Sequence, residues 1–211
     1  TRSILEVLNE FNHSVGMVTK SALVERDIDI LSEMAKKNLV RVYFSVTTLD
    51  KVLARKMEPR AATPLRRLEA MRALSDAGIP TGVMVAPIIP QLNDKDIEAI
   101  LEAAYAAGAR SAGYVMLRLP HELKEVFKDW LQQHYPLRAE HVMSLIKQLR
   151  GGKEYDATWG TRMRGTGEFA DFIEQRFRKA CTRYGLNQKR LPVDVSQFRK
   201  PKLDGQLDLF A

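Results

Sequence analysis

Four short segments hold most of the polar groups that could form a site, and each comes at the end of an apolar, β-branched stretch. These segments are Thr19-Lys20-Ser21, Ser45-Val46-Thr47-Thr48, Ala86-Pro87-Ile88-Ile89-Pro90 and Arg118-Leu119-Pro120. They carry hydroxyls, an ammonium and a guanidinium but no carboxylate. Such groups suit a polar ligand with anionic and sugar-like parts, and they offer little acid–base chemistry of their own. We therefore expect a bound cofactor to perform the chemistry.

Other catalytic patterns are missing from the sequence. It contains no recognisable Ser-His-Asp arrangement, no His/Cys metal spacing and no glycine-rich phosphate loop. The single cysteine, Cys181, excludes a disulfide framework within the chain and favours a reducing, cytoplasmic location. No apolar run approaches the ~20 residues of a membrane helix. The net charge of +7 favours anionic partners such as nucleic acid, although a merely basic surface would explain it equally well.

A repeated unit of helix, stop residue and strand must position these segments. We predict strands at 14–18, 39–46, 81–88 and 111–118, because these stretches are apolar and rich in β-branched residues. Asn38, Gly78 and Gly108 are the expected helix stops; Thr63 and Asn93 are the expected caps of the helices that follow them. Strands that are apolar on both faces indicate a parallel α/β sheet, whose carboxyl ends share one edge and bind the ligand.

The remainder of the chain divides into two further parts. Helical spacing continues at 121–134, 138–150 and 168–184, which predicts an α-helical extension over residues 121–187. Residues 188–211 are polar, basic and proline-containing, and we expect a flexible tail there. Four strands are too few to close a barrel, and the sequence begins at Thr1 rather than methionine. We therefore expect a fragment whose earlier strands lie upstream.

Several motifs in residues 1–150 resemble the core of radical S-adenosylmethionine (SAM) enzymes. The run Glu58-Pro59-Arg60-Ala61-Ala62-Thr63-Pro64 is followed by a helix that ends Ala77-Gly78-Ile79-Pro80 and by the strand Gly82-Val83-Met84-Val85-Ala86-Pro87-Ile88. This combination looks closest to the spore photoproduct lyase branch. The resemblance implies an open (β/α)6 partial TIM barrel, with its last four β/α units in residues 1–120.

The resemblance also implies two cofactors, SAM and a 4Fe–4S cluster. In this superfamily a Cys-x-x-x-Cys-x-x-Cys motif after the first strand holds the cluster. The motif is absent here, and Cys181 cannot replace it, because cluster ligation needs several converging thiolates. We expect the ligands upstream of this chain and predict no metal ligand within it. The sequence alone is therefore expected to be inactive, unless it is a cluster-free homologue.

Positions that match the family motifs supply the candidate binding residues. By resemblance, Lys20 would contact the SAM carboxylate and Ser45 its ribose, while Ala86 would let the adenine approach the backbone. Leu117 or Leu119 would pack on the adenine face, and Arg118 would reach an anionic substrate. The alternatives are a solvated Lys20, a satisfied strand-end hydroxyl at Ser45, ordinary core packing at the apolar positions and a carboxylate partner for Arg118. No hydrogen-atom donor or other catalytic residue is assigned, because neither Tyr114 nor Cys181 matches the family's donors.

The last residues carry a separate signal. Gln206-Leu207-Asp208-Leu209-Phe210 is similar to the pentapeptide by which bacterial DNA polymerases and repair proteins dock on the replication sliding clamp. Leu209 and Phe210 could fill an apolar pocket while Gln206 hydrogen-bonds at its edge. The alternative is a tail that folds back on its own core.

Three functions agree with these observations. The first is a radical SAM enzyme that acts on nucleic acid and repairs a DNA lesion. The second is a radical SAM enzyme that acts on a peptide or small molecule, because fold does not fix substrate. The third is a cluster-free binding module.

Overall fold

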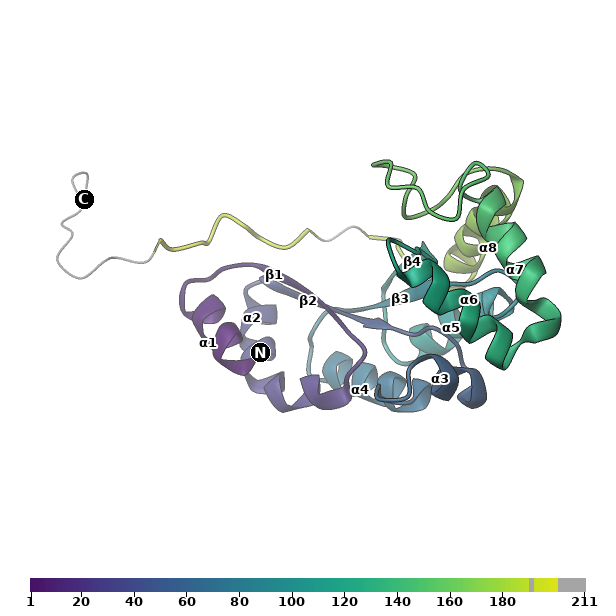
Figure 1. Ribbon diagram of the computed structural model, residues 1–211. Coiled ribbons are helices and arrows are strands. Elements are labelled where there is room, and N and C mark those ends of the chain that lie inside the picture. The colour runs from purple at the N-terminus through teal and green to yellow at the C-terminus, as the bar shows by residue number, and fades with distance from the viewer. Residues whose placement is uncertain (190–191, 201–211) are drawn as a thin grey trace.

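A parallel sheet of four strands, in the order β1-β2-β3-β4, forms the centre of the protein (Figure 1). The structure is a computed structural model and describes residues 1–189 and 192–200. The strands are β1 (Val15–Thr19), β2 (Val40–Ser45), β3 (Thr81–Ile88) and β4 (Ser111–Met116). The helices are α1 (Arg2–Glu10), α2 (Ile28–Lys36), α3 (Lys51–Met57), α4 (Pro64–Asp76), α5 (Ile97–Ala106), α6 (Leu123–His134), α7 (Pro136–Gln148) and α8 (Glu168–Tyr184), with 3-10 turns at Ala22–Asp27 and Asp94–Asp96. The predicted α/β class, the parallel sheet and the resemblance to a partial barrel are confirmed.

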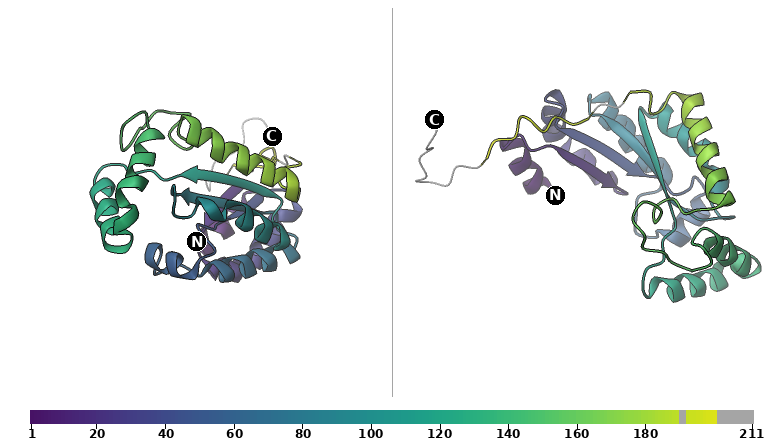
Figure 2. Two further views of the ribbon diagram at one scale, coloured as in Figure 1. Left: turned by 90° about the vertical axis from the view of Figure 1, so that its right-hand side faces the viewer. Right: turned by 90° about the horizontal axis from the view of Figure 1, so that it is seen from above.

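The two faces of the sheet differ in burial. Val42, Phe44 and Val83 point into the main core, where they are fully buried beneath α2, α4 and α5. The alternate positions are open, since Val18 is 65% exposed and Met84 is half-buried. Helices therefore cover one face, as Figure 2 shows, and the other face remains available. The sequence pattern alone predicted burial on both faces.

Most of the predicted helix boundaries are confirmed. The Thr63 hydroxyl accepts from the Arg66 amide at 3.3 Å and caps α4, and Asn38, Gly78 and Gly108 adopt the positive φ values of helix stops. Asn93 is different. Its side chain makes no cap, and α5 begins at Ile97 after a 3-10 turn. Helices α1 and α3 were not predicted.

The helices after β4 pack in two different places. Helices α6 and α7 pack on each other around a second apolar core that includes Ile89, Leu119 and Leu131. Helix α8 instead returns to the sheet, where Phe177 contacts Tyr114 at 4.7 Å between ring centroids and Arg176 forms a bidentate pair with Glu98 of α5. Within residues 1–189 and 192–200, no helix combines the length and apolar character needed to cross a membrane.

Part of the segment expected to be a flexible tail makes defined contacts. The Asp194 amide donates to the Asn38 carbonyl and the Arg199 amide to the Phe11 carbonyl, each at 2.8 Å. The Phe198 ring also meets His13 edge-on at 5.3 Å. Residues 192–199 thus lie beside α1 and the loop before β2. They are held there by long-range contacts, which the local sequence pattern does not reveal.

A buried ion pair joins α4 to the loop after α3. The Arg67 side chain is 2% exposed and its guanidinium contacts Glu58, which is 11% exposed. Arg67 also donates to the carbonyls of Ser45 at 2.7 Å and Ala62 at 2.8 Å. Burial alone would raise the pKa of Glu58, but hydrogen bonds from Lys20 and Arg67 outweigh it and hold the pKa below its usual range.

We predict that Glu58→Gln destabilises the protein by about 3 kcal/mol at neutral pH, because it leaves the Arg67 charge buried and unpaired. The matched control is Glu69→Gln, which removes an exposed surface pair with Arg66 and should cost about 0.5 kcal/mol or less. Urea unfolding followed by circular dichroism measures both.

The same pair predicts a pH dependence. The folded-state pKa of Glu58 is lowered, so its stabilisation is complete above the unfolded pKa of about 4.3 and is lost as the pH falls through the folded value. The difference in the free energy of unfolding between the native protein and Glu58→Gln should therefore decrease below about pH 4. A gap that stays constant into acid would contradict this assignment.

Candidate cofactor and substrate site

The predicted binding residues lie along the edge formed by the carboxyl ends of the strands. The register aligns Thr19 with Phe44 and Ser45 with Met84, so neighbouring strands end close together. Lys20 directly follows β1, Ser45 ends β2 and Ala86 lies near the end of β3. The segment after β4 joins the same edge, because the Leu117 amide donates to the Ile88 carbonyl at 2.9 Å.

The Glu58 carboxylate connects three of these strand ends. One oxygen, Oε1, contacts the Lys20 ammonium and accepts from the Thr47 hydroxyl at 3.0 Å. Thr47 Oγ1 lies 3.1 Å from the Ala86 carbonyl oxygen. The other carboxylate oxygen contacts Arg67, which holds the carbonyl of Ser45. This partly buried carboxylate thereby fixes Lys20 and, through Arg67, Ser45 relative to each other, and it holds the Thr47 hydroxyl beside Ala86.

Asn93 braces the same edge from the β3–α5 loop. It is 1% exposed, and its amide donates to the carbonyls of Thr47 at 2.7 Å and Pro87 at 2.9 Å. Its side-chain oxygen accepts from the Ile89 amide at 2.6 Å. These bonds join the loops after β2 and β3, which explains why Asn93 is used here rather than as a helix cap.

An apolar pocket of about 230 Å³ opens beside this edge. It is lined by residues from the ends of β3 and β4 and from α3 and α6, namely Met57, Ile89, Leu117, Arg118, Leu119, Leu123, Val126, Phe127 and Trp130. The structure therefore brings the three predicted residues 117–119 into one pocket. Leu117 is half-buried there, whereas Leu119 is 3% exposed and belongs mainly to the second core.

Of the residues that the structure describes, Arg118 is the only charged one that lines this pocket. Its guanidinium lies 3.2 Å from the Tyr155 hydroxyl and 3.7 Å from the Met163 sulfur, and its Nε is buried without a hydrogen-bond partner. Arg150 lies on the other side of this chain segment, 4% exposed, and donates to the Leu117 carbonyl at 2.9 Å. Burial, and then the charge of Arg118, lowers the pKa of Arg150. The end of β4 is thus a region of positive charge.

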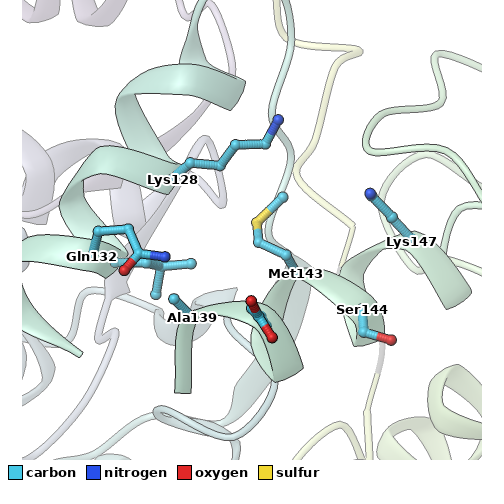
Figure 3. A pocket seen from close by; sticks show the side chains of 8 residues that line it. Lys128, Gln132, Ala139, Met143, Ser144 and Lys147 are labelled. Atoms are coloured by element: carbon cyan, nitrogen blue, oxygen red, sulfur yellow. The ribbon is translucent and has the colours of Figure 1, made fainter. Parts of the chain in front are cut away.

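A larger cavity, of about 410 Å³, lies away from the strand ends. Figure 3 shows its lining, which comes entirely from α6 and α7. Its two lysines, Lys128 and Lys147, both approach the Glu154 carboxylate, at 2.9 and 3.5 Å. Glu125 also lies 3.0 Å from Lys128, so both lysines already have carboxylate partners. Because no strand-end residue lines the cavity either, we do not include it in the site.

The described residues offer no cluster site. Among residues 1–189 and 192–200, no group of three or more His, Cys, Asp or Glu side chains is placed to hold a metal ion. Cys181 is buried in the main core, and burial raises the pKa of its thiol to about 11, which disfavours the thiolate that a metal needs. A 4Fe–4S cluster therefore does not fit the residues present.

Sequence reasoning found the strand ends but missed the residues that hold them. Glu58 was recognised only as part of a motif and Asn93 only as an expected helix cap, while Arg67 and Arg150 were not singled out. The spacing of three and four residues from Arg67 to Ala70 and Met71, in the helix expected between Thr63 and Gly78, was the one available signal for Arg67. The clamp-like residues Gln206, Leu207, Asp208, Leu209 and Phe210 lie outside the described part of the chain.

Comparison with known sequences finds a matching family model and several relatives. Residues 2–104 match the model of the radical SAM superfamily. An uncharacterized protein of Acidianus two-tailed virus is 39% identical over 166 residues, which are 76% of this chain and 50% of that protein. An uncharacterized protein of Mycobacterium tuberculosis is 33% identical over 136 residues, 64% of this chain and 40% of that protein. The chain thus spans about half the length of these relatives.

Comparison with solved structures identifies the fold. A mutant spore photoproduct lyase with a dinucleoside spore photoproduct matches with a TM-score of 0.60 and 18% identity, over 88% of this chain and 55% of that one. A second mutant of that enzyme, with bound AdoMet and the same photoproduct, matches with a TM-score of 0.59 and 18% identity, over 88% of this chain and 54% of that one. Residues 2–104 therefore match the radical SAM superfamily, and the sheet and helices of the chain have a fold similar to that of spore photoproduct lyase.

Proposed function

We propose that the complete protein is a radical SAM enzyme that binds SAM along the carboxyl ends of β1 to β4 and acts on a nucleic acid. The observation that carries this proposal is the hydrogen-bond network that Glu58 forms with Lys20, Thr47 and Arg67. This network places Lys20, Ser45 and Ala86 on one edge beside an apolar pocket. Rigid placement of the groups around a reactive cofactor is what such chemistry requires.

The residues present fit the parts of SAM. Lys20 is 43% exposed and its ammonium has three donors, so it can contact both Glu58 and the SAM carboxylate. Ala86 is half-buried and presents only a methyl group, which leaves room for a planar ring against the backbone. Leu117 offers apolar surface for the adenine face. Ser45 and Leu119 expose 6% and 3% of their surface, so their contacts would be limited to the open side of the sheet.

The proposal for SAM binding does not include a site for the 4Fe–4S cluster in this chain. When bound to a reduced 4Fe–4S cluster, SAM supplies a 5′-deoxyadenosyl radical. We assign no cluster ligand to this chain and no catalytic step to its residues. Their proposed work is to bind and orient the cofactor and to keep water from its apolar part.

Two observations favour a nucleic acid substrate. Net charge is +7, and the pocket beside the cofactor edge carries the positive charge of Arg118 without a carboxylate within 4 Å among the described residues. The solved structures of similar fold hold a dinucleoside spore photoproduct. We therefore place DNA lesion repair or nucleic-acid modification ahead of chemistry on a peptide or small molecule.

We predict that Lys20→Ala and Ser45→Ala each weaken SAM binding by about tenfold or more, because each removes a hydrogen bond to the cofactor, charge-assisted in the case of Lys20. Isothermal titration of the anaerobically prepared complete protein measures the affinity. Lys36→Ala is the control, since Lys36 is an exposed lysine in the last turn of α2. Unchanged affinity in both site variants would remove these residues from the SAM site.

We also propose, from the sequence motif alone, that residues 206–210 dock on a bacterial sliding clamp. A peptide of residues 202–211 should bind purified clamp with a dissociation constant on the order of micromolar, because it must become ordered on docking. Substituting Leu209→Ala and Phe210→Ala together should abolish binding. Binding should change little between 50 and 200 mM salt, unlike phosphate-driven binding. Equal binding by the doubly substituted peptide, or none at ~100 μM clamp, would end this proposal.

A further inference from the structure

We propose that the segment between α7 and α8, residues 149–167, forms with Arg118 the docking surface for a single-stranded nucleic acid. In this surface Trp159 stacks on an unpaired base and Arg118 contacts a phosphate. The inference deepens the proposed function, on which it rests, by naming the part of the molecule that holds the substrate.

The segment is fixed at the end of β4 rather than free. The Met116 amide donates to the Met163 carbonyl at 2.9 Å, and the Thr166 amide donates to the Leu149 carbonyl at 3.0 Å. Buried Arg150 donates to the carbonyl of Arg162 at 2.9 Å and to that of Leu117 at the same distance. These bonds hold the segment beside Arg118 and the apolar pocket, so it is ordered before any ligand arrives. Figure 2 shows this loop at the tip of β4.

Trp159 provides an aromatic surface that the fold itself does not use. The side chain is 83% exposed, and the Arg162 guanidinium lies 4.3 Å from its ring centroid. An indole left in water while a cation contacts its face is well suited to stack on a nucleobase. Base–aromatic stacking, together with contacts to the phosphates, is how single-strand binding proteins bind without sequence preference.

The arginines of this surface form no ion pair among the described residues, although the charge of Asp156 acts on Arg150. Among the described residues, no carboxylate lies within 4 Å of the guanidiniums of Arg118, Arg150, Arg162 or Arg164. Asp156 belongs to the same segment, but its carboxylate accepts hydrogen bonds from the amide and hydroxyl of Thr158 at 3.1 and 2.7 Å. Arg118 also has a buried Nε without a partner. A phosphodiester would instead accept from the Nη groups of Arg118, whose partners among the described residues are the Tyr155 hydroxyl and the Met163 sulfur.

The dimensions favour a single strand over a duplex. The adjoining pocket, at about 230 Å³, lies below the usual range for a drug-sized ligand, which suits one planar ring system rather than a paired helix. In a duplex the base faces are already stacked on one another and are not available to Trp159. The alternation of cation and aromatic ring therefore matches a strand whose bases are unpaired.

The test measures the fluorescence anisotropy of a labelled eight-nucleotide oligothymidylate titrated with the 211-residue chain. Trp159→Ala should weaken binding about five- to 150-fold, the loss expected for one base stack, and Trp159→Phe should restore most of it. Arg118→Gln should weaken binding and lower the slope of log affinity against log salt by about 0.7. The matched control is Arg183→Ala, which removes another exposed arginine that lies over an aromatic ring and should change affinity less than twofold.

Three outcomes would overturn the inference: no binding at about 100 μM protein, equal binding by native chain and Trp159→Ala, or an equal loss in Arg183→Ala. The inference would also be overturned if inorganic polyphosphate displaced the oligonucleotide at the same concentration from the native chain and from Trp159→Ala. That result would indicate an anion site only. The assay uses neither SAM nor a cluster, so its failure leaves the titration of Lys20→Ala and Ser45→Ala to judge the proposed function independently.

Discussion

The site depends on one buried ion pair, between Arg67 on α4 and Glu58 after α3. A guanidinium that is 2% exposed costs too much free energy to bury without acceptors, and Glu58 with the carbonyls of Ser45 and Ala62 provides one acceptor for each of its three nitrogens. The same carboxylate then reaches Lys20 and Thr47. The ends of β1 and β2 are thus both linked to the Glu58 carboxylate, which fixes the distance between them.

The sheet explains why that spacing matters. Parallel strands bring residues distant in sequence to one edge, while helices on a single face leave the other face open to a ligand. Helix α6 contributes an apolar wall, and the segment before α8 returns to β4 and adds arginines to its end. The cofactor edge and the proposed nucleic-acid surface therefore meet at residues 117–119, where apolar and cationic groups lie side by side.

The sequence patterns correctly predicted the features that depend on interactions within a few residues. The strand over 81–88, the cap at Thr63 and the helix over 168–184 agree with the structure, because apolar periodicity and capping act within a few residues. The pairing of Arg67 with Glu58 was not predictable, since a charged residue on a helix reads as solvated until the fold buries it. Asn93 shows the same limit: one amide can cap a helix or bridge two loops, and only the tertiary structure selects the second.

The central claim is that this edge serves SAM radical chemistry in the complete protein. The most direct measurement is the formation of 5′-deoxyadenosine by that protein, prepared without oxygen, loaded with its cluster and reduced in the presence of SAM. The account predicts that 5′-deoxyadenosine accumulates in the native protein and is strongly diminished in Ser45→Ala. A cluster-loaded, reduced protein that binds SAM yet forms no 5′-deoxyadenosine would contradict it.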